Sequence, residues 1–154
     1  MKKELKKAVL VDIDGTLVSI TEFDYSIFSK SEEEIKGYLA MWDARTMDAC
    51  VYSDAVEMVK KFKEMGYVIV VLTARGQSCK KYTWKKFRQI GIDKLVDSVW
   101  HRPLAWEGKS SALYKEWMIK KLSKKWVFEW AMEDEEKNKE VMKKAGMKIW
   151  HGRG

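Results

Sequence analysis

Two carboxylates stand close together near the start of the chain, in the stretch AVLVDIDGTLVS that covers residues 8–19. Asp12 and Asp14 follow four apolar residues, and in an extended segment residues i and i+2 point to the same side. Their charges would then repel each other in one small region, unless a cation or a division of acid and base roles relieves the repulsion. A solvated Asp-Gly turn that ends a strand is the simpler interpretation, and these residues alone leave it open.

Other polar side chains follow the later strand-like runs. They are Thr73 and Arg75 after YVIVVL, His101 and Arg102 after DSVW, and Glu133 and Asp134 after WVFEWAM. Ligands of an open parallel sheet bind beyond the carboxyl ends of its strands, so we expect these side chains to meet there. Lys115 lies on the predicted helix between the last two runs. Carboxylates, a hydroxyl, a lysine and arginines at one edge predict a site for a phosphoryl group and a magnesium ion.

Each of these residue types suits phosphoryl transfer, which asks a protein mainly for positioning and charge neutralisation. Mg²⁺ prefers carboxylate oxygens and water, which Asp12, Asp14 and Asp134 can supply, with Glu133 in a supporting role. A carboxylate can also attack phosphorus and form an aspartyl phosphate. A second carboxylate nearby can protonate the leaving oxygen and later activate water.

The elements that position these residues alternate along the chain. Apolar runs predict strands over residues 8–12, 67–72, 97–100, 126–132 and 147–150. Caps and helical spacing predict helices over residues 31–41, 53–65, 78–90, 110–122 and 135–145. This order predicts an α/β, Rossmann-like fold, with a parallel sheet of about five strands flanked by helices. We expect one domain over residues 1–154, in which residues 18–51 form a flap and a small helical insertion over the site.

The composition narrows the environment and the partners. The net charge of +7 favours a polyanionic partner, nucleic acid first, although a solvated Lys/Glu-rich surface would give the same balance. Two cysteines, Cys50 and Cys79, leave no Cys-rich zinc site or disulfide framework and suit a reducing compartment. No apolar run reaches membrane-spanning length, and only four apolar residues follow the basic start. These features predict a cytoplasmic protein.

The motifs resemble those of the haloacid dehalogenase (HAD) superfamily of phosphohydrolases. DIDGT is similar to its first motif, LTAR to its second, Lys115 to its third and EDEEKN to its acidic fourth, in the same order. The resemblance implies a HAD fold and a Mg²⁺-dependent phosphomonoesterase. It also implies that Asp12 is the nucleophile and Asp14 the general acid and base, and that Thr73 and Lys115 stabilise the transferring group while Asp134 holds the metal.

A closer resemblance is to the 3′-phosphatase domain of bacteriophage polynucleotide kinase and its free-standing relatives. The similar segments are MWDARTMDAC, VVLTARG with YTWKKF, HRP, LYKEWM and EDEEKNKEVMKKAGMKIW. The resemblance implies removal of 3′-phosphates from nucleic acid ends or nucleotides, and Trp42 and Asp43 are expected to help close the site. No Walker A pattern occurs. Between Arg102 and Lys115 the chain reads LAWEGKSSA, where the relatives carry Gly-Asp-x-Arg-x-Asp, and Lys109 is the candidate to replace that arginine.

The substrate contacts follow from these positions. Arg75, Arg102 and Lys109 are expected to bind phosphate or substrate, and Trp84 and Trp106 are candidate platforms on which a base stacks. Two alternatives stay open: a phosphatase of small metabolites (a nucleotidase or sugar-phosphate phosphatase), and a non-catalytic nucleic-acid-binding protein on a HAD scaffold. A pure binding module would need no pair of carboxylates such as Asp12 and Asp14, which speaks against the second alternative.

Overall fold

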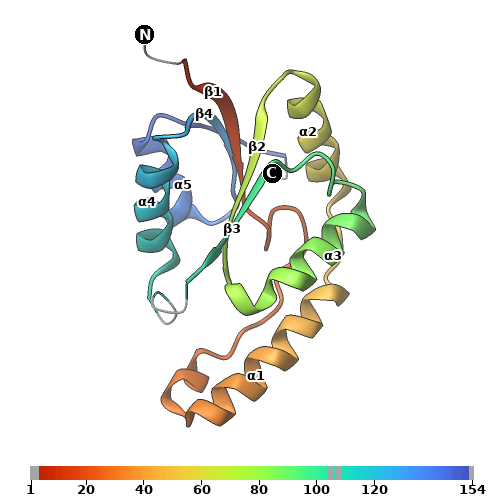
Figure 1. Ribbon diagram of the computed structural model, residues 1–154, viewed down its shortest axis with the longest axis vertical. Coiled ribbons are helices and arrows are strands. Elements are labelled where there is room, and N and C mark those ends of the chain that lie inside the picture. The colour runs from red at the N-terminus through yellow and green to blue at the C-terminus, as the bar shows by residue number, and fades with distance from the viewer. Residues whose placement is uncertain (1–3, 104–105, 107–108, 153–154) are drawn as a thin grey trace.

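A parallel sheet forms the centre of the molecule. The computed structural model describes residues 4–103, 106 and 109–152, and in these residues five parallel strands lie in the order β3-β2-β1-β4-β5 (Figure 1). The strands are β1 (Lys6–Val11), β2 (Val68–Gly76), β3 (Ser98–Arg102), β4 (Trp126–Met132) and β5 (Lys148–Trp150). The predicted α/β architecture is confirmed, and β1, the strand that carries Asp12 at its end, is the central one.

Helices connect these strands. They are α1 (Glu32–Arg45), α2 (Ser53–Glu64), α3 (Lys80–Ile90), α4 (Ser111–Leu122) and α5 (Glu136–Lys144), with short 3₁₀ turns η1 (Tyr25–Ser29), η2 (Thr46–Asp48) and η3 (Gln77–Cys79). The helices expected from the sequence are all present. The largest differences are that α1 extends beyond residue 41 and that β2 extends to Gly76, so that Thr73 and Arg75 lie in the strand itself.

Alternate residues of the central strands pack on opposite faces of the sheet. Val9 and Val11 belong to the core that α2 and α3 cover, whereas Ala8 and Leu10 belong to the core under α4 and α5. All four side chains are fully buried. A strand that is covered on both faces reads as a continuous apolar run, which is why β1 and β2 are legible in the sequence.

The segment between β1 and α2 forms an insertion, which contains η1, α1 and η2 and lies beyond the carboxyl ends of the strands (Figure 1). Its first long helix begins where a capping box predicts it, because the Ser31 hydroxyl accepts a hydrogen bond from Glu34 N at 3.2 Å. At the other end of α1, Trp42 Nε1 donates to the carbonyls of Thr21 and Glu22. This anchor extends α1 past the predicted end and ties it back to the first part of the insertion.

One buried lysine fastens the return of the insertion to the main body. Lys86 on α3 donates from Nζ to the carbonyl oxygens of Met47 and Ala49, both at 2.8 Å. Lys86 is buried, whereas its neighbour Lys85 is exposed. The Lys86 ammonium therefore supplies a hydrogen-bond donor to two carbonyls after α1 that have no backbone donor of their own in a regular element of the described chain.

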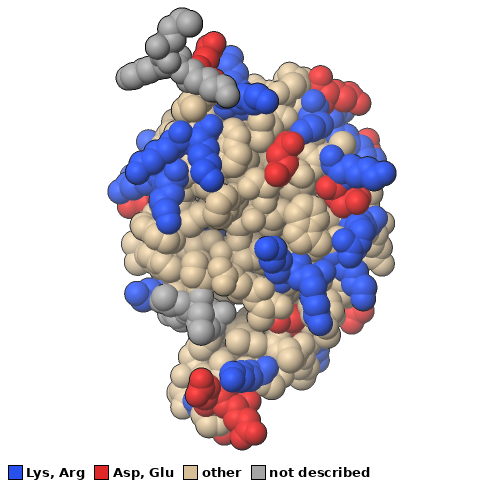
Figure 2. Space-filling view, in the orientation of Figure 1, with Lys and Arg blue, Asp and Glu red and all other residues tan. Residues whose placement is uncertain are grey.

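Basic side chains cover the surface around two helices. In the view of Figure 2 they gather over α3 and over the end of α4 that leads into β4. The exposed members are Lys80, Lys81, Lys85 and Arg88 on α3, and Lys120, Lys121, Lys124 and Lys125 at and after the end of α4. In the described part of the chain, no helix has the length and apolar character needed to cross a bilayer.

Lys86 and the two carbonyls that it binds, which we call the lysine clamp, give a first prediction. Lys86→Met keeps the length of the side chain but removes the donor, which leaves two carbonyls of the insertion without their charged partner. We expect the free energy of unfolding to fall by about 2 kcal/mol, the usual worth of hydrogen bonds to a charged group, as measured by urea denaturation. Lys85→Met on the same helix is the control and should change it by less than about 0.5 kcal/mol; equal effects would contradict the clamp.

Candidate active site

A buried ammonium group holds two carboxylates at the carboxyl edge of the sheet. Lys115 on α4 is almost completely buried, and its Nζ lies 3.0 Å from Asp12 Oδ1 and 2.9 Å from Glu133 Oε1. Burial alone would lower the pKa of Lys115, but the charges of Asp12 and Glu133 outweigh it and raise the pKa. Lys115 is therefore a permanent cation between the ends of β1 and β4.

The carboxylates at this point exceed the charge that Lys115 can balance. Burial raises the pKa of Asp12 well above its usual value, and the charge of Glu133 raises it further. Acceptor oxygens of Asp12, Glu133 and Asp134 all lie within 4.8 Å of one another. Glu133 Oε2 is buried and accepts no hydrogen bond from any residue that the structure describes. An unsatisfied oxygen in a set of hard oxygen donors fits a divalent cation such as Mg²⁺.

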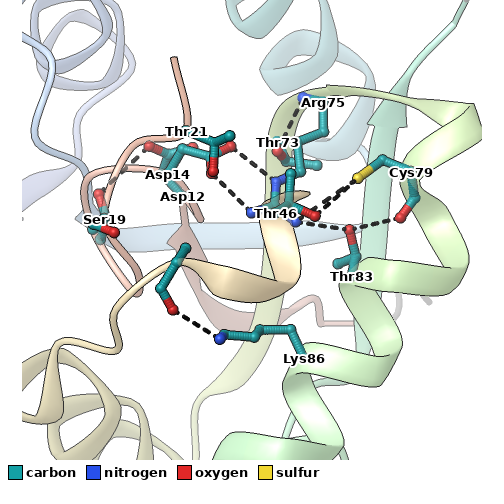
Figure 3. A network of polar contacts seen from close by, with 12 residues as sticks. Asp12, Asp14, Ser19, Thr21, Thr46, Thr73, Arg75, Cys79, Thr83 and Lys86 are labelled. Carbon is teal, nitrogen blue, oxygen red and sulfur yellow. Dashed lines mark hydrogen bonds and ion pairs between the residues drawn. The ribbon is translucent and has the colours of Figure 1, made fainter. Parts of the chain in front are cut away.

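Asp14 is held by a different cation. Arg75 donates to it through two parallel hydrogen bonds, from Nε to Oδ2 at 2.9 Å and from Nη2 to Oδ1 at 2.8 Å (Figure 3). The Arg75 guanidinium is buried, which would lower its pKa, but Asp14 raises the pKa again. The Asp14 carboxylate thus faces Arg75 and is not one of the three clustered carboxylates, so metal binding by its side chain stays a prediction.

A second layer of polar groups supports Arg75. Its Nη1 donates to Thr83 Oγ1 at 3.4 Å, and Thr83 Oγ1 in turn donates to the carbonyl of Cys79 (Figure 3). His101 Nε2 lies 3.0 Å from the same hydroxyl. Burial, then the charges of Arg75 and Lys80, lower the pKa of His101 to about 4. His101 is therefore neutral near pH 7, and its ring contacts the Thr83 hydroxyl and does not line the cavity.

The loop after β1 approaches the acidic cluster closely. Gly15 has a φ of +81°, and a Cβ added there would collide with the carboxylate of Asp134. The Thr16 hydroxyl lies 3.5 Å from Asp12 Oδ2 and 3.4 Å from Asp134 Oδ1. The DGT part of the first motif therefore seats the loop against the end of β4, which only a glycine at this position permits.

These groups open into one cavity of about 370 Å³. Its polar lining includes most of the residues predicted for the site: Asp12, Asp14, Arg75, Arg102, Lys115 and Asp134. Trp42 and Asp43, the two residues of the insertion that are expected to help close the site, also line the cavity. One cavity thus contains the candidate nucleophile, the candidate acid and three basic side chains.

The remaining predicted residues lie near the cavity or outside it. Thr73 is buried, and its Oγ1 accepts a hydrogen bond from Arg75 N at 3.0 Å. Lys109 is exposed, with its ammonium 5.2 Å from the centre of the Trp106 ring. Trp84 packs against Phe87 and the core between the sheet and α2 and α3. Neither Lys109 nor Trp84 lines the described cavity, so substrate binding by these two stays a prediction for the surface outside it.

Arg102 has a more structural environment than expected. Its Nη1 donates to the carbonyls of Trp106 and Lys109, at 3.3 and 2.9 Å, and its guanidinium lies 5.6 Å from the centre of the Tyr114 ring. Arg102 also lines the cavity. The side chain therefore binds the backbone of Trp106 and of Lys109 while it also lines the cavity.

Sequence reasoning missed part of the cavity wall. Phe23, Tyr25 and Phe28 line it, as does Asn138 on α5. The signal available was three aromatic residues within six positions, in a stretch with neither helical nor strand periodicity. A search for apolar periodicity passes over such a stretch, because its aromatic residues face a cavity and not a core.

The close approach of Gly15 and Asp134 gives a second prediction. Gly91 has the same φ of +81°, but nothing lies within 4 Å of a Cβ added there. Gly91→Ala should cost about 1–2 kcal/mol of unfolding free energy from backbone strain. Gly15→Ala should cost more, because Asp134 must move, and it should also abolish any rise of Tm on addition of Mg²⁺. Equal losses of stability, with the Mg²⁺ response retained in both variants, would contradict the contact.

Several solved structures share the fold. A chain of the Pnkp1/Rnl/Hen1 RNA repair complex matches with a TM-score of 0.71 and 20% identity, over 95% of this chain and 42% of that one. A predicted phosphatase from Clostridium acetobutylicum matches with a TM-score of 0.62 and 16% identity, over 95% and 84%. The class C acid phosphatase from Bacillus anthracis with tungstate bound gives 0.60 and 14%, over 88% and 54%. The protein thus spans less than half the length of the RNA repair chain.

A comparison with curated proteins finds no match. The family model of HAD superfamily, subfamily IIIB (acid phosphatase) matches residues 1–129, which is most of the chain. The motifs in DIDGT, LTAR and around Lys115 fall within this range, and the sheet order and the clustered carboxylates agree with the match. The chain therefore belongs to subfamily IIIB of the HAD superfamily, the acid phosphatase subfamily.

Proposed function

We propose that the protein is a Mg²⁺-dependent phosphomonoesterase that works through an aspartyl phosphate and removes 3′-phosphates from nucleic acid ends or nucleotides. The observation that carries the proposal is the separate environment of two neighbouring carboxylates. Asp12 is bonded to Lys115 at the floor of the cavity, whereas Asp14 is held to one side by Arg75. Two carboxylates with different partners suit two different roles in one reaction.

The metal is part of the same proposal. Asp12, Glu133 and Asp134 would hold Mg²⁺, since their oxygens cluster and one of them has no partner among the described residues. When bound, the ion would neutralise charge on the phosphoryl oxygens and keep buried Asp12 ionised. Lys115 supplies a second positive charge at the same point.

The residues can then divide the chemistry. An Asp12 oxygen attacks phosphorus, the ester P–O bond breaks, and Asp14 gives its proton to the leaving oxygen. Asp14 next takes a proton from water, whose oxygen attacks the phosphorus of the aspartyl phosphate, so that inorganic phosphate leaves and Asp12 is restored. Arg75 keeps Asp14 oriented through both steps. Thr73, next to the nucleophile's strand, and Lys115 stabilise the transferring group.

The substrate assignment rests on charge. Exposed lysines on α3 and at the end of α4 form a surface suited to a polyanion (Figure 2). A protein of similar fold belongs to an RNA repair complex, which supports the same class of substrate. The size of the cavity suits a single phosphorylated unit, so a small-metabolite phosphatase is the alternative. A reducing, cytoplasmic setting is also proposed, because exposed Cys50 and buried Cys79 are both free thiols.

A substrate comparison tests the proposal directly. The wild type should hydrolyse 3′-phosphorylated oligonucleotides or nucleoside 3′-phosphates in Mg²⁺, with higher kcat/KM than 5′-phosphates and sugar phosphates, and EDTA should abolish the activity. Asp12→Asn, which keeps the shape and removes the nucleophile, is the matched control and should be inactive on every substrate. If Asp12→Asn kept activity within tenfold of wild type, or if the wild type were fully active in EDTA, the proposed mechanism would be wrong. If the wild type preferred sugar phosphates, the proposed substrate class would be wrong.

The role of Asp14 gives a separate prediction. Asp14→Asn cannot donate a proton, so hydrolysis of an alkyl phosphate should fall by about 10²–10⁴-fold, and hydrolysis of 4-nitrophenyl phosphate, whose leaving group needs no proton, should fall much less. Arg75→Lys keeps the acid but loses the two parallel hydrogen bonds, so it should slow both esters by similar factors. Steady-state kcat values for the two esters make the comparison. Equal losses for both esters in Asp14→Asn would rule out the general-acid role.

Salt dependence tests the basic surface. If lysines of α3 contact the backbone of a single strand, log kcat/KM should fall by about 0.7 per log unit of salt for each phosphate contacted. Charge reversal at Lys81 and Lys85 should flatten this slope for an oligonucleotide. The same reversal at Lys143 and Lys144, exposed at the end of α5, is the control. A slope that is flat in the wild type would assign these lysines to solvation only.

A further inference from the structure

Half of the tryptophans of the chain gather around one helix, outside the cavity. Trp117 lies on α4, and three further rings pack against the core that α4 and α5 cover, namely Trp100, Trp106 and Trp126. Each of these rings has a lysine ammonium within 6.0 Å of its centre, from Lys109, Lys121 or Lys125. We call these tryptophans and lysines the tryptophan–lysine face.

Two indoles of this face stack on each other. The ring centroids of Trp106 and Trp117 lie 5.1 Å apart, with 29° between the ring planes. Lys121 Nζ lies 4.4 Å from the centre of the Trp117 ring, and Lys109 Nζ lies 5.2 Å from the centre of the Trp106 ring. These distances are within the range of cation–π attraction. Trp117 is 36% exposed, so the surface of this stack carries charge and an open aromatic ring together.

One lysine contacts both of the other rings. Lys125 Nζ lies 5.1 Å from the centre of the Trp100 ring and 6.0 Å from the centre of the Trp126 ring. Lys125 is exposed and follows the end of α4, whereas Trp100 and Trp126 are half-buried and come from β3 and β4. The face therefore extends from the loop after β3 to the start of β4.

The positive charge of this face is not balanced by acidic side chains. Among the described residues, Lys120 forms an ion pair with Glu116 at 3.8 Å, but Lys121, Lys124 and Lys125 form none. Figure 2 shows basic side chains gathered over this end of α4. Unpaired ammonium groups beside aromatic rings suit an anionic partner that also has flat apolar surfaces.

The face is continuous with the edge of the cavity. Arg102 lines the cavity, and its Nη1 donates to the carbonyls of Trp106 and Lys109. Ser111, the first residue of α4, also lines the cavity, whereas Lys121 lies at the other end of the helix. The 12 residues of α4 span roughly 18 Å. A chain whose end lies in the cavity can therefore leave it past Arg102 and follow α4 over the face.

A nucleotide would suit both partners of each cation–π pair. An exposed pair of this kind is weaker than the stacking of a base on an aromatic ring. A phosphate that binds the ammonium makes a charge-assisted hydrogen bond and draws the lysine away from the ring. The base of the same or the next nucleotide can then take the place of the ammonium over the indole. In the absence of a ligand, the lysine covers the ring and shields it from water.

We propose that the tryptophan–lysine face binds the single-stranded segment that leads to the phosphorylated 3′ end, an inference that rests on the proposed nucleic acid function. The lysines bind backbone phosphates, and bases stack on the indoles. Trp106, a stacking platform expected from the sequence, belongs to this face. A duplex fits less well, because its bases already stack on one another and do not expose their faces. An acidic peptide would match the charge but would leave the rings without a stacking partner.

The test measures binding without the phosphate that enters the cavity. A short oligonucleotide with a fluorophore at its 5′ end and a free 3′ hydroxyl is titrated with the protein, and fluorescence anisotropy gives Kd. The wild type should bind the single strand about fivefold or more tightly than a blunt duplex of the same sequence. Trp117→Ala should weaken single-strand binding about fivefold or more, the loss expected of one base–aromatic stack. Trp117→Phe, which keeps a ring, should recover most of it.

The charge is tested separately with a matched control. The double variant Lys121→Gln, Lys125→Gln should lower the slope of log Kd against log salt by about 0.7 for each phosphate contact that is lost. Lys148→Gln is the control, because Lys148 is also exposed and lies 5.6 Å from the centre of a tryptophan ring, that of Trp130. It belongs to β5, at the opposite edge of the sheet from β3, so neither Kd nor the slope should change.

The outcomes separate the face from the proposed reaction. Equal affinity for single strand and duplex, or an affinity that Trp117→Ala leaves unchanged while urea denaturation shows that the variant is folded, would overturn the inference alone. Hydrolysis of a 3′-phosphorylated oligonucleotide by the wild type is measured in parallel. No hydrolysis, together with single-strand binding that depends on Trp117, would overturn the proposed function and retain the face as a nucleic-acid-binding surface.

Discussion

The buried ammonium of Lys115 is the interaction on which the rest of the site depends. It joins the ends of two neighbouring strands, through Asp12 after β1 and Glu133 after β4, and it comes from a helix on one face of the sheet. Removal of one member of such a buried set leaves a buried charge without its partner, which strongly destabilises the fold. The register of β1 against β4 and the position of α4 thus both depend on the pairing of the Lys115 ammonium with the carboxylates of Asp12 and Glu133.

Asp14 takes no part in the ion pairs of Lys115, although it stands only two residues from Asp12. The same-side geometry of an extended chain predicts two carboxylates in one region, and both do line one cavity. The structure relieves their repulsion by giving each its own cation, Lys115 for Asp12 and Arg75 for Asp14. Arg75 suits its part because a planar guanidinium matches a carboxylate with two parallel hydrogen bonds, which a lysine cannot do.

The sequence predicts the sheet and most of the floor of the cavity, but not its wall. Continuous apolar runs and caps identify the strands and helices, and polar residues at strand ends then meet because parallel strands share one edge. The aromatic residues of the wall pack on one another and line the cavity, so they follow neither the helical nor the strand periodicity of apolar residues. The stacking role of Trp84 is predicted from its place on a basic helix close to the site, and that position does not reveal that part of the ring packs on the core. The pairing of Arg75 with Asp14 depends on distances between separate elements, which spacing in the sequence does not contain.

The insertion leaves and rejoins the main body at nearly one point. Val18 bridges Val51, and Ser19 N donates to the carbonyl of Cys50 at 2.8 Å. A loop whose ends already touch can be lengthened or exchanged at a small entropic cost, about 0.6 kcal/mol for each doubling of its length. The aromatic part of the cavity wall comes from this one continuous stretch, whereas the floor comes from several strands and helices. Related proteins can therefore change the ligands that the cavity accepts by exchanging this one segment, while the residues of the floor and their chemistry stay the same.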